Sequence, residues 1–116
     1  MKLKGYIVFH LNLAFSSIEK NVRADVIKTC YHSLLNLIEQ TGIPIGIELT
    51  GWTLKQIERI DNDWIIRFRN LLNSNNCELI GSGYCQLIGP LVPHKVNDWN
   101  QTLGLQEYSR ILGVRP

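Results

Sequence analysis

The sequence has no long hydrophobic run, no signal peptide and no basic stripe, and each absence excludes a class of protein. No apolar stretch approaches the ~20 residues that a membrane-spanning helix needs. The opening segment Met1–Gly5 turns polar too soon for a signal peptide. The 12 Lys and Arg residues are scattered along the chain, and the formal net charge is only +2. These features argue against membrane insertion and nucleic-acid binding, and we expect a cytoplasmic protein.

Cysteine is also scarce. The three cysteines, Cys30, Cys77 and Cys85, are an odd number and have no C-x-x-C spacing. This pattern disfavours both a zinc site and a disulfide framework, so we expect three small buried thiols in a reducing compartment. No spacing of His, Cys, Asp or Glu indicates a metal triad, and no Ser-His-Asp arrangement is visible. We therefore predict no metal and no cofactor.

What the chain does contain is an alternation of apolar runs and helical stripes. Of its 116 residues, 45% are hydrophobic and 19% are charged, which is enough to bury a core. Short apolar runs predict strands, and apolar residues three or four apart predict helices. The expected strands cover residues 4–11, 45–50 and 77–81, and the expected helices cover residues 21–40, 53–60, 61–72 and a last stretch from His94 or Val96 to Leu112. We expect the first strand to be covered on both faces, because it is apolar nearly throughout.

Local signals place the ends of these helices. Gly42 and Gly113 each follow an expected helix, at the position where glycine tolerates a left-handed backbone. Thr53 and Gln56 have the spacing of a capping box. Asp61 is a good N-cap for the helix that follows it.

The predicted order β-α-β-α-α-β-α places the chain in the α/β class. Strands that alternate with helices imply right-handed crossovers and a parallel sheet. Three strands are few for such a sheet, and the sequence stops where a fourth strand should begin. We interpret residues 1–116 as the N-terminal portion of one larger β/α domain, truncated before its fourth strand.

Polar side chains follow each of the three expected strands. His10 and Asn12 end the first strand, Trp52 follows the second, and Tyr84 and Gln86 follow the third. The carboxyl ends of parallel strands share one edge of a sheet, where ligand sites are built. We therefore expect these five side chains to lie on one rim and to bind substrate.

Each candidate also has a simpler structural interpretation. His10 could equally be a buried histidine bonded to a backbone carbonyl, and Trp52 could plug the rim rather than stack on a sugar. Glu48 lies inside the second strand, where a buried carboxylate would need a partner. His32 is expected on a helix surface, and His94 at the start of the last helix.

Four segments of the chain carry a resemblance to a known family. They are His10–Phe15, Ile45–Glu58, Glu78–Gln86 and Gln106–Pro116. In this order they resemble four features of the N-terminal portion of the family 57 glycoside hydrolases, which act on α-glucans. These features are a strand-end histidine motif, a strand followed by Ser-Gly and a helix, a Gly-Glu-x-x-x-His type motif, and a helix that leads to Phe-Gly-x-x-Pro. The resemblance covers nearly the whole chain.

The resemblance implies an incomplete (β/α)7-type barrel, of which this chain would form the first strands. It also implies that His10, Asn12, Trp52, Tyr84 and Gln86 hold an α-glucan or a similar oligosaccharide or polysaccharide. The glutamate nucleophile and the aspartate acid/base of that family lie on later strands, beyond this segment. We therefore nominate no catalytic residue here and expect the segment alone to be inactive.

The chain departs from the family pattern at four positions. Asn12 and Ala14 replace a polar residue and a proline, Ser82 stands where an acidic residue is frequent, and Gln86 replaces a histidine. Glutamine can bond a sugar hydroxyl but cannot titrate near neutrality.

Three functions remain open: a glycoside hydrolase or glucanotransferase, a non-catalytic carbohydrate-binding or regulatory domain, and a polysaccharide deacetylase-like protein. The last lacks the strand-end Asp and the His-x-x-x-His helix that its metal requires. The sequence leaves the linkage that is cleaved and the oligomeric state open.

Overall fold

The computed structural model describes all 116 residues, and its three strands form one parallel sheet in the order β1-β2-β3. The strands are β1 (Val8–Leu11), β2 (Ile45–Leu49) and β3 (Cys77–Gly81). Phe9 lies opposite Ile47, which in turn lies opposite Leu79. The α/β class and the parallel pairing are as predicted, and the arrangement is compatible with part of a β/α barrel.

The chain also forms five α-helices. They are α1 (Arg23–Val26), α2 (His32–Thr41), α3 (Gly51–Ile60), α4 (Asn62–Asn73) and α5 (His94–Leu112), with short helical turns at Lys20–Val22, Ile27–Tyr31 and Gly89–Leu91. The turn Ile27–Tyr31 is π-helical and joins α1 to α2, so the helix expected over 21–40 is present with an altered middle. No helix of the structure, α5 included, is long and apolar enough to cross a membrane.

Most local signals for the helix ends are confirmed. Gly42 and Gly113 are left-handed, with φ of 64° and 73°. The side chain of Asp61 accepts a hydrogen bond from Trp64 N at 3.3 Å, as an N-cap does. The capping box at Thr53 is wrong, because α3 begins two residues earlier.

Thr50 is the residue that caps α3. Its Oγ1 accepts from Thr53 N at 3.1 Å, while the Thr53 hydroxyl is buried and lies 3.4 Å from the N–H of Leu13. Thr53 thus ties the chain after β1 to the first turn of α3. The predicted capping box is not formed, because the hydroxyl of Thr53 contacts Leu13 N and the helix is capped by Thr50.

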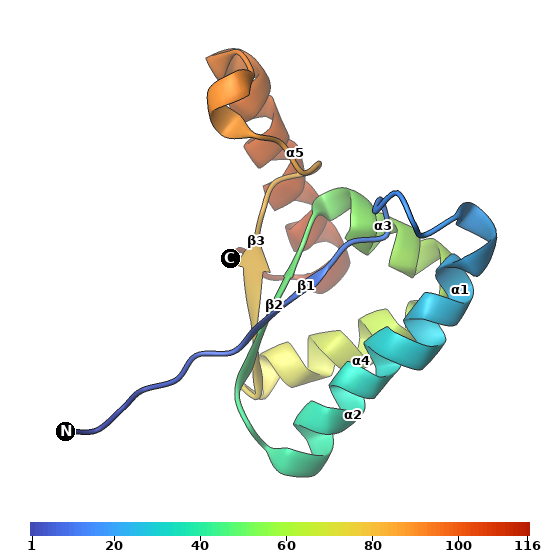
Figure 1. Ribbon diagram of the computed structural model, residues 1–116, viewed down its shortest axis with the longest axis vertical. Helices are drawn as coiled ribbons and strands as arrows, with labels where there is room; N and C mark the ends of the chain where they lie inside the picture. The colour runs from blue at the N-terminus through green and yellow to red at the C-terminus, as the bar shows by residue number, and fades with distance from the viewer.

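The sheet is covered on one face only (Figure 1). Helices α1 to α4 lie on one side of it, where Leu11, Ile47 and Leu79 are buried. The opposite face leaves Val8 45% exposed. The expectation that the first strand is buried on both faces is therefore wrong. That strand is also shorter than the expected 4–11. Its first residues form an exposed tail that extends away from the body of the molecule (Figure 1), and Ile7 contributes only the carbonyl that accepts from Gly46 N at 2.9 Å.

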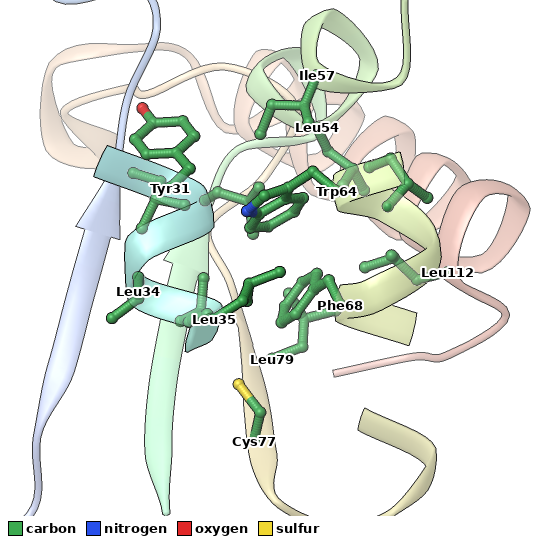
Figure 2. Close-up of a cluster of buried hydrophobic side chains, with 14 of the residues drawn as sticks. Tyr31, Leu34, Leu35, Leu54, Ile57, Trp64, Phe68, Cys77, Leu79 and Leu112 are labelled. Atoms are coloured by element: carbon green, nitrogen blue, oxygen red, sulfur yellow. The ribbon is translucent and has the colours of Figure 1, made fainter. Parts of the chain in front are cut away.

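The core fills the space between the sheet and the helices (Figure 2). Trp64 and Phe68 of α4 lie at its centre, with ring centroids 4.8 Å apart and planes inclined by 40°. Leu35 of α2, Leu54 of α3 and Leu79 of β3 are buried in the same cluster. This shared core holds the strands and helices as one unit, so the loops at the strand ends start from a rigid base.

The cysteines differ from expectation. Only Cys77, on β3, is buried, and burial raises the pKa of its thiol to about 11. Cys30 and Cys85 are exposed. Cys30 lies in the π-helical turn, and Cys85 lies in the loop after β3.

Candidate functional site

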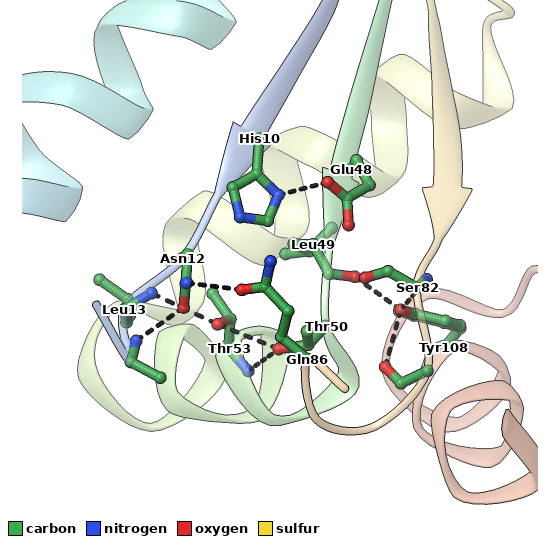
Figure 3. Close-up of polar contacts among 12 residues, drawn as sticks. His10, Asn12, Leu13, Glu48, Leu49, Thr50, Thr53, Ser82, Gln86 and Tyr108 are labelled. Carbon is green, nitrogen blue, oxygen red and sulfur yellow. Dashed lines mark hydrogen bonds and ion pairs between the residues drawn. The ribbon is translucent and has the colours of Figure 1, made fainter. Parts of the chain in front are cut away.

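Polar groups from the first and third strands meet at the carboxyl end of the sheet. Asn12 directly follows β1, and Gln86 lies in the loop that follows β3. The Nδ2 of Asn12 donates to Oε1 of Gln86 at 3.0 Å, although β2 lies between the two strands (Figure 3). The loop after β3 therefore crosses over the end of β2.

The first turn of α3 holds this loop in place. The N–H groups of Gly51 and Trp52 donate to the carbonyls of Gly83 and Tyr84, at 2.9 and 2.8 Å. The first N–H groups of a helix have no partner within the helix, and here the loop supplies the acceptors. The end of β2 is thus joined directly to the segment that carries Gln86.

A hollow of about 470 Å³ opens at this rim. Its lining is mostly apolar but includes two side-chain amides; the lining residues are Asn12, Ala14, Thr50, Trp52, Cys85, Gln86, Leu87 and Ile88. This volume lies within the range of small-molecule sites, roughly 300–1,000 Å³. The indole of Trp52 forms a wall, and the guanidinium of Arg23 lies over its ring, 5.1 Å from the ring centroid. That face of the indole is therefore occupied by the protein itself.

His10 lies on the open face of the sheet, outside the lining of this hollow. Its Nδ1 is hydrogen-bonded to the carboxylate of Glu48, its neighbour on β2. The side chain of His10 is 42% exposed, which rules out the buried histidine of the structural interpretation. Since a carboxylate accepts, Nδ1 carries the proton and Nε2 is left without a partner.

Tyr84 is placed as a support rather than as a lining residue. Its N–H donates to Asn100 O at 2.9 Å, and its ring packs against the start of α3, where a Cβ on Gly51 would come within 3.2 Å of it.

The hydroxyl of Ser82 is buried and has no hydrogen-bond partner. Of the five residues predicted to bind substrate, Asn12, Trp52 and Gln86 line the hollow, while His10 and Tyr84 do not.

Two carboxylates, not one, lie on the open face. Glu48 of β2 was considered from the sequence. The second carboxylate, Glu78 of β3, was not, and it is hydrogen-bonded to the hydroxyl of Tyr6. This bond is the main cause that raises the pKa of Tyr6. Glu78 lies opposite Gly46, which is two residues before Glu48 on β2, so the two carboxylates are not directly opposite each other. Each is hydrogen-bonded to a different side chain, and neither lines the hollow.

The other two histidines differ in outcome. His94 is the first residue of α5, as predicted. It is exposed, and its Nδ1 lies 3.0 Å from Oδ2 of Asp98. His32 was expected on a helix surface and is half-buried instead. Its Nε2 lies 2.8 Å from the carboxylate of Asp61, and its Nδ1 lies 2.7 Å from Nη1 of Arg67.

Three residues of α5 that sequence reasoning missed hold the rim together. The hydroxyl of Tyr108 donates to Leu49 O at 2.6 Å and accepts from Ser82 N at 3.1 Å, so it joins the ends of β2 and β3 (Figure 3). Burial raises the pKa of this hydroxyl. Asn100 and Gly104 are also buried. The three are four residues apart, which is the stripe of one helix face, and that spacing is the signal that could have found them.

Comparison with known proteins gave one match. The sequence model of a family described as Glycosyl hydrolase family 57 matches residues 4–116, and the matched range includes all three strands and the whole rim. No curated protein and no solved structure matches the chain significantly.

Proposed function

Because the chain belongs to glycosyl hydrolase family 57, a family of carbohydrate-active proteins, we propose that its rim hollow binds an α-glucan-like polysaccharide. The observation that carries this proposal is the pair of side-chain amides, Asn12 and Gln86, at the edge of a mostly apolar hollow. The whole protein would act as a glycoside hydrolase or glucanotransferase.

The chemistry of the hollow suits a sugar. A sugar ring presents hydroxyls that both donate and accept hydrogen bonds, and side-chain amides do the same. It also presents apolar C–H groups, which can pack on Trp52, Leu87 and Ile88. No charged side chain lines the hollow, so a neutral ligand meets no desolvation penalty from an unpaired charge.

His10 would add a hydrogen bond from the open face of the sheet. The bond to Glu48 fixes which ring nitrogen carries the proton. The free Nε2 can then contact a sugar hydroxyl.

Catalysis needs a second set of residues. Retaining hydrolysis requires two carboxyl groups about 5 Å apart across the scissile bond. We assign the nucleophile and the acid/base to residues outside 1–116, because the carboxylate of Glu48 is hydrogen-bonded to His10 and that of Glu78 to Tyr6. The role of this segment is then to hold the glucan beside them.

The test is maltoheptaose binding to the full-length protein, measured by isothermal titration calorimetry. We expect Gln86→Ala to weaken binding about fivefold to tenfold, because a lost hydrogen bond costs about 1 kcal/mol. Gln40→Ala, which removes an exposed amide from α2, is the matched control and should not change the affinity. Equal affinity of Gln86→Ala and the wild type would contradict the proposal, as would a wild type that does not bind.

A non-catalytic binding domain is the second candidate. It is favoured by Gln86, which lines the hollow at the position of a family histidine and cannot exchange a proton near neutrality. Product analysis after incubation of full-length protein with maltoheptaose separates the two candidates. Shortened or lengthened oligosaccharides would indicate the enzyme, whereas binding without new products would indicate the binding domain.

A further inference from the structure

Helix α5 holds the loop that carries Gln86, and we propose that Asn100 is a positioning residue of the binding site. In this proposal Asn100 fixes the loop 83–86 so that the side chain of Gln86 meets Asn12 over the hollow. The ligand in this inference rests on the function proposed above, whereas the positioning of the loop rests on geometry alone.

Asn100 binds the loop as a neighbouring strand would. Its Nδ2 donates to Cys85 O at 2.9 Å, and its Oδ1 accepts from Cys85 N at 2.7 Å. Its backbone carbonyl accepts from Tyr84 N at 2.9 Å. The side chain is buried, and these are the hydrogen bonds that satisfy both backbone groups of Cys85.

Glycines bring the helix and the loop into backbone contact. A Cβ on Gly104 would lie 2.5 Å from the carbonyl carbon of Gly83 and 2.8 Å from Tyr84 N. A Cβ on Gly83 would lie 2.4 Å from Nδ2 of Asn100, and Gly83 has a φ of 86°. Side chains at either position would push α5 away from the loop. The close approach therefore places the amide of Asn100 where it can bond Cys85.

Asn100 is the nearest anchor to Gln86. Tyr84 is held by Trp52 N and by the backbone of Asn100, and Cys85 is held by the Asn100 side chain. Gln86 is the next residue, and its own contact is the hydrogen bond from Asn12. Without the Asn100 amide, the loop would lose its last fixed point before Gln86, and ligand binding would have to order the loop.

The experiment compares three variants of the full-length protein. Asn100→Ala removes both side-chain bonds. Asn100→Asp keeps the size and the acceptor for Cys85 N but loses the donor to Cys85 O. Thr102→Ala, at an exposed position of the same helix, is the control. The measurements are hydrogen exchange of the Cys85 amide, the NMR signals of the Asn12 side-chain amide, and the affinity for maltoheptaose.

We expect Asn100→Ala to speed exchange at Cys85 by about tenfold or more. It should also shift the Asn12 signals and raise the dissociation constant for maltoheptaose by about fivefold or more. Asn100→Asp sets a carboxylate oxygen against the Cys85 carbonyl, where two acceptors repel each other, so it should also speed exchange at Cys85 and weaken binding. It carries the test if Asn100→Ala does not fold cooperatively. Thr102→Ala should match the wild type in all three measurements.

Two results would overturn the proposal. One is unchanged exchange and unchanged Asn12 signals in both Asn100 variants. The other is faster exchange with an unchanged dissociation constant, which would make Asn100 a loop anchor with no influence on the site. If wild-type protein fails to bind maltoheptaose, the proposed function fails instead. The exchange and the Asn12 signals, recorded without sugar, then still decide whether Asn100 positions Gln86.

Discussion

At the scale of single residues, the rim depends on a few side chains whose partners are all on the same end of the sheet. Asn12 bonds Gln86, and His10 bonds Glu48 on the neighbouring strand. None of these four residues belongs to the hydrophobic core. Their hydrogen bonds therefore set the chemistry of the rim more than they set the stability of the fold.

His10→Ala should accordingly weaken sugar binding and leave the protein folded. The imidazole is partly exposed, and its removal leaves no cavity in the core. A lost ligand hydrogen bond should cost about 0.5–3 kcal/mol. Calorimetry with maltoheptaose and a thermal melt of the same variant decide the matter. A melting temperature several degrees lower with unchanged affinity would assign His10 a structural role.

At the scale of elements, α2 and α4 are linked through a chain of polar contacts centred on His32. Arg67 can only donate hydrogen bonds, so Nδ1 of His32 must accept and Nε2–H must donate to Asp61. Arg67 also bonds the carboxylate of Glu39 on α2, at 3.0 Å from Nη2. Asp61 is both the N-cap of α4 and the partner of His32, so one carboxylate serves the helix end and the helix pair.

The stability of the protein should fall in acid through Asp61. Burial raises the pKa of the Asp61 carboxyl, but the hydrogen bonds from His32 and Trp64 N lower it by more. The pKa in the folded state therefore lies below the ordinary value of 3.8. A lowered pKa in the folded state means that the unfolded state binds the proton more readily. The contribution of Asp61 to the free energy of unfolding is therefore full above the unfolded pKa of 3.8. It is lost as the pH falls through the lower pKa of the folded state.

Urea unfolding between about pH 6 and about pH 2, on the order of two units either side of the unfolded carboxyl pKa, measures this dependence. Asp61→Asn keeps an N-cap of equal quality and should flatten the dependence, by less than about 1 kcal/mol because the pair is partly exposed. Asp25→Asn, which removes an exposed carboxylate from α1, is the control. Identical slopes for Asp61→Asn and the wild type would contradict the role given to Asp61.

The element scale also shows what the sequence could predict. Asp61, Gly42 and Gly113 act within one helical turn of themselves, so their local pattern was sufficient. The start of α3 was missed because Thr53 bonds the chain after β1, 40 residues away. Asn100 was missed for the same reason, since its partner Cys85 lies 15 residues away in a loop without periodicity. The spacing of Asn100, Gly104 and Tyr108 marks one buried face of α5, but no local pattern indicates which distant residues that face contacts.

At the scale of the whole molecule, the arrangement of the sheet decides what remains accessible. The strand order follows the chain order, and helices α1 to α4 cover the same face. This leaves the other face and the outer edges of β1 and β3 without a partner. Exposed strand edges are templates for pairing with another chain. The polar residues His10, Glu48 and Glu78 make the open face hydrophilic in part, but Val8 and Tyr6 on it are exposed.

Residues 1–116 expressed alone should therefore associate, and should not hydrolyse maltooligosaccharides. Association follows from the open face and the free edge of β1, and inactivity follows from our assignment of the catalytic carboxylates to other residues. Light scattering coupled to gel filtration measures the first, and product analysis measures the second. Val8→Lys adds a charge to the exposed edge strand and should reduce association, whereas Ile66→Lys, at an exposed position of α4, should not. A monomer that melts cooperatively well above ~65 °C would contradict the expected exposure of these edges.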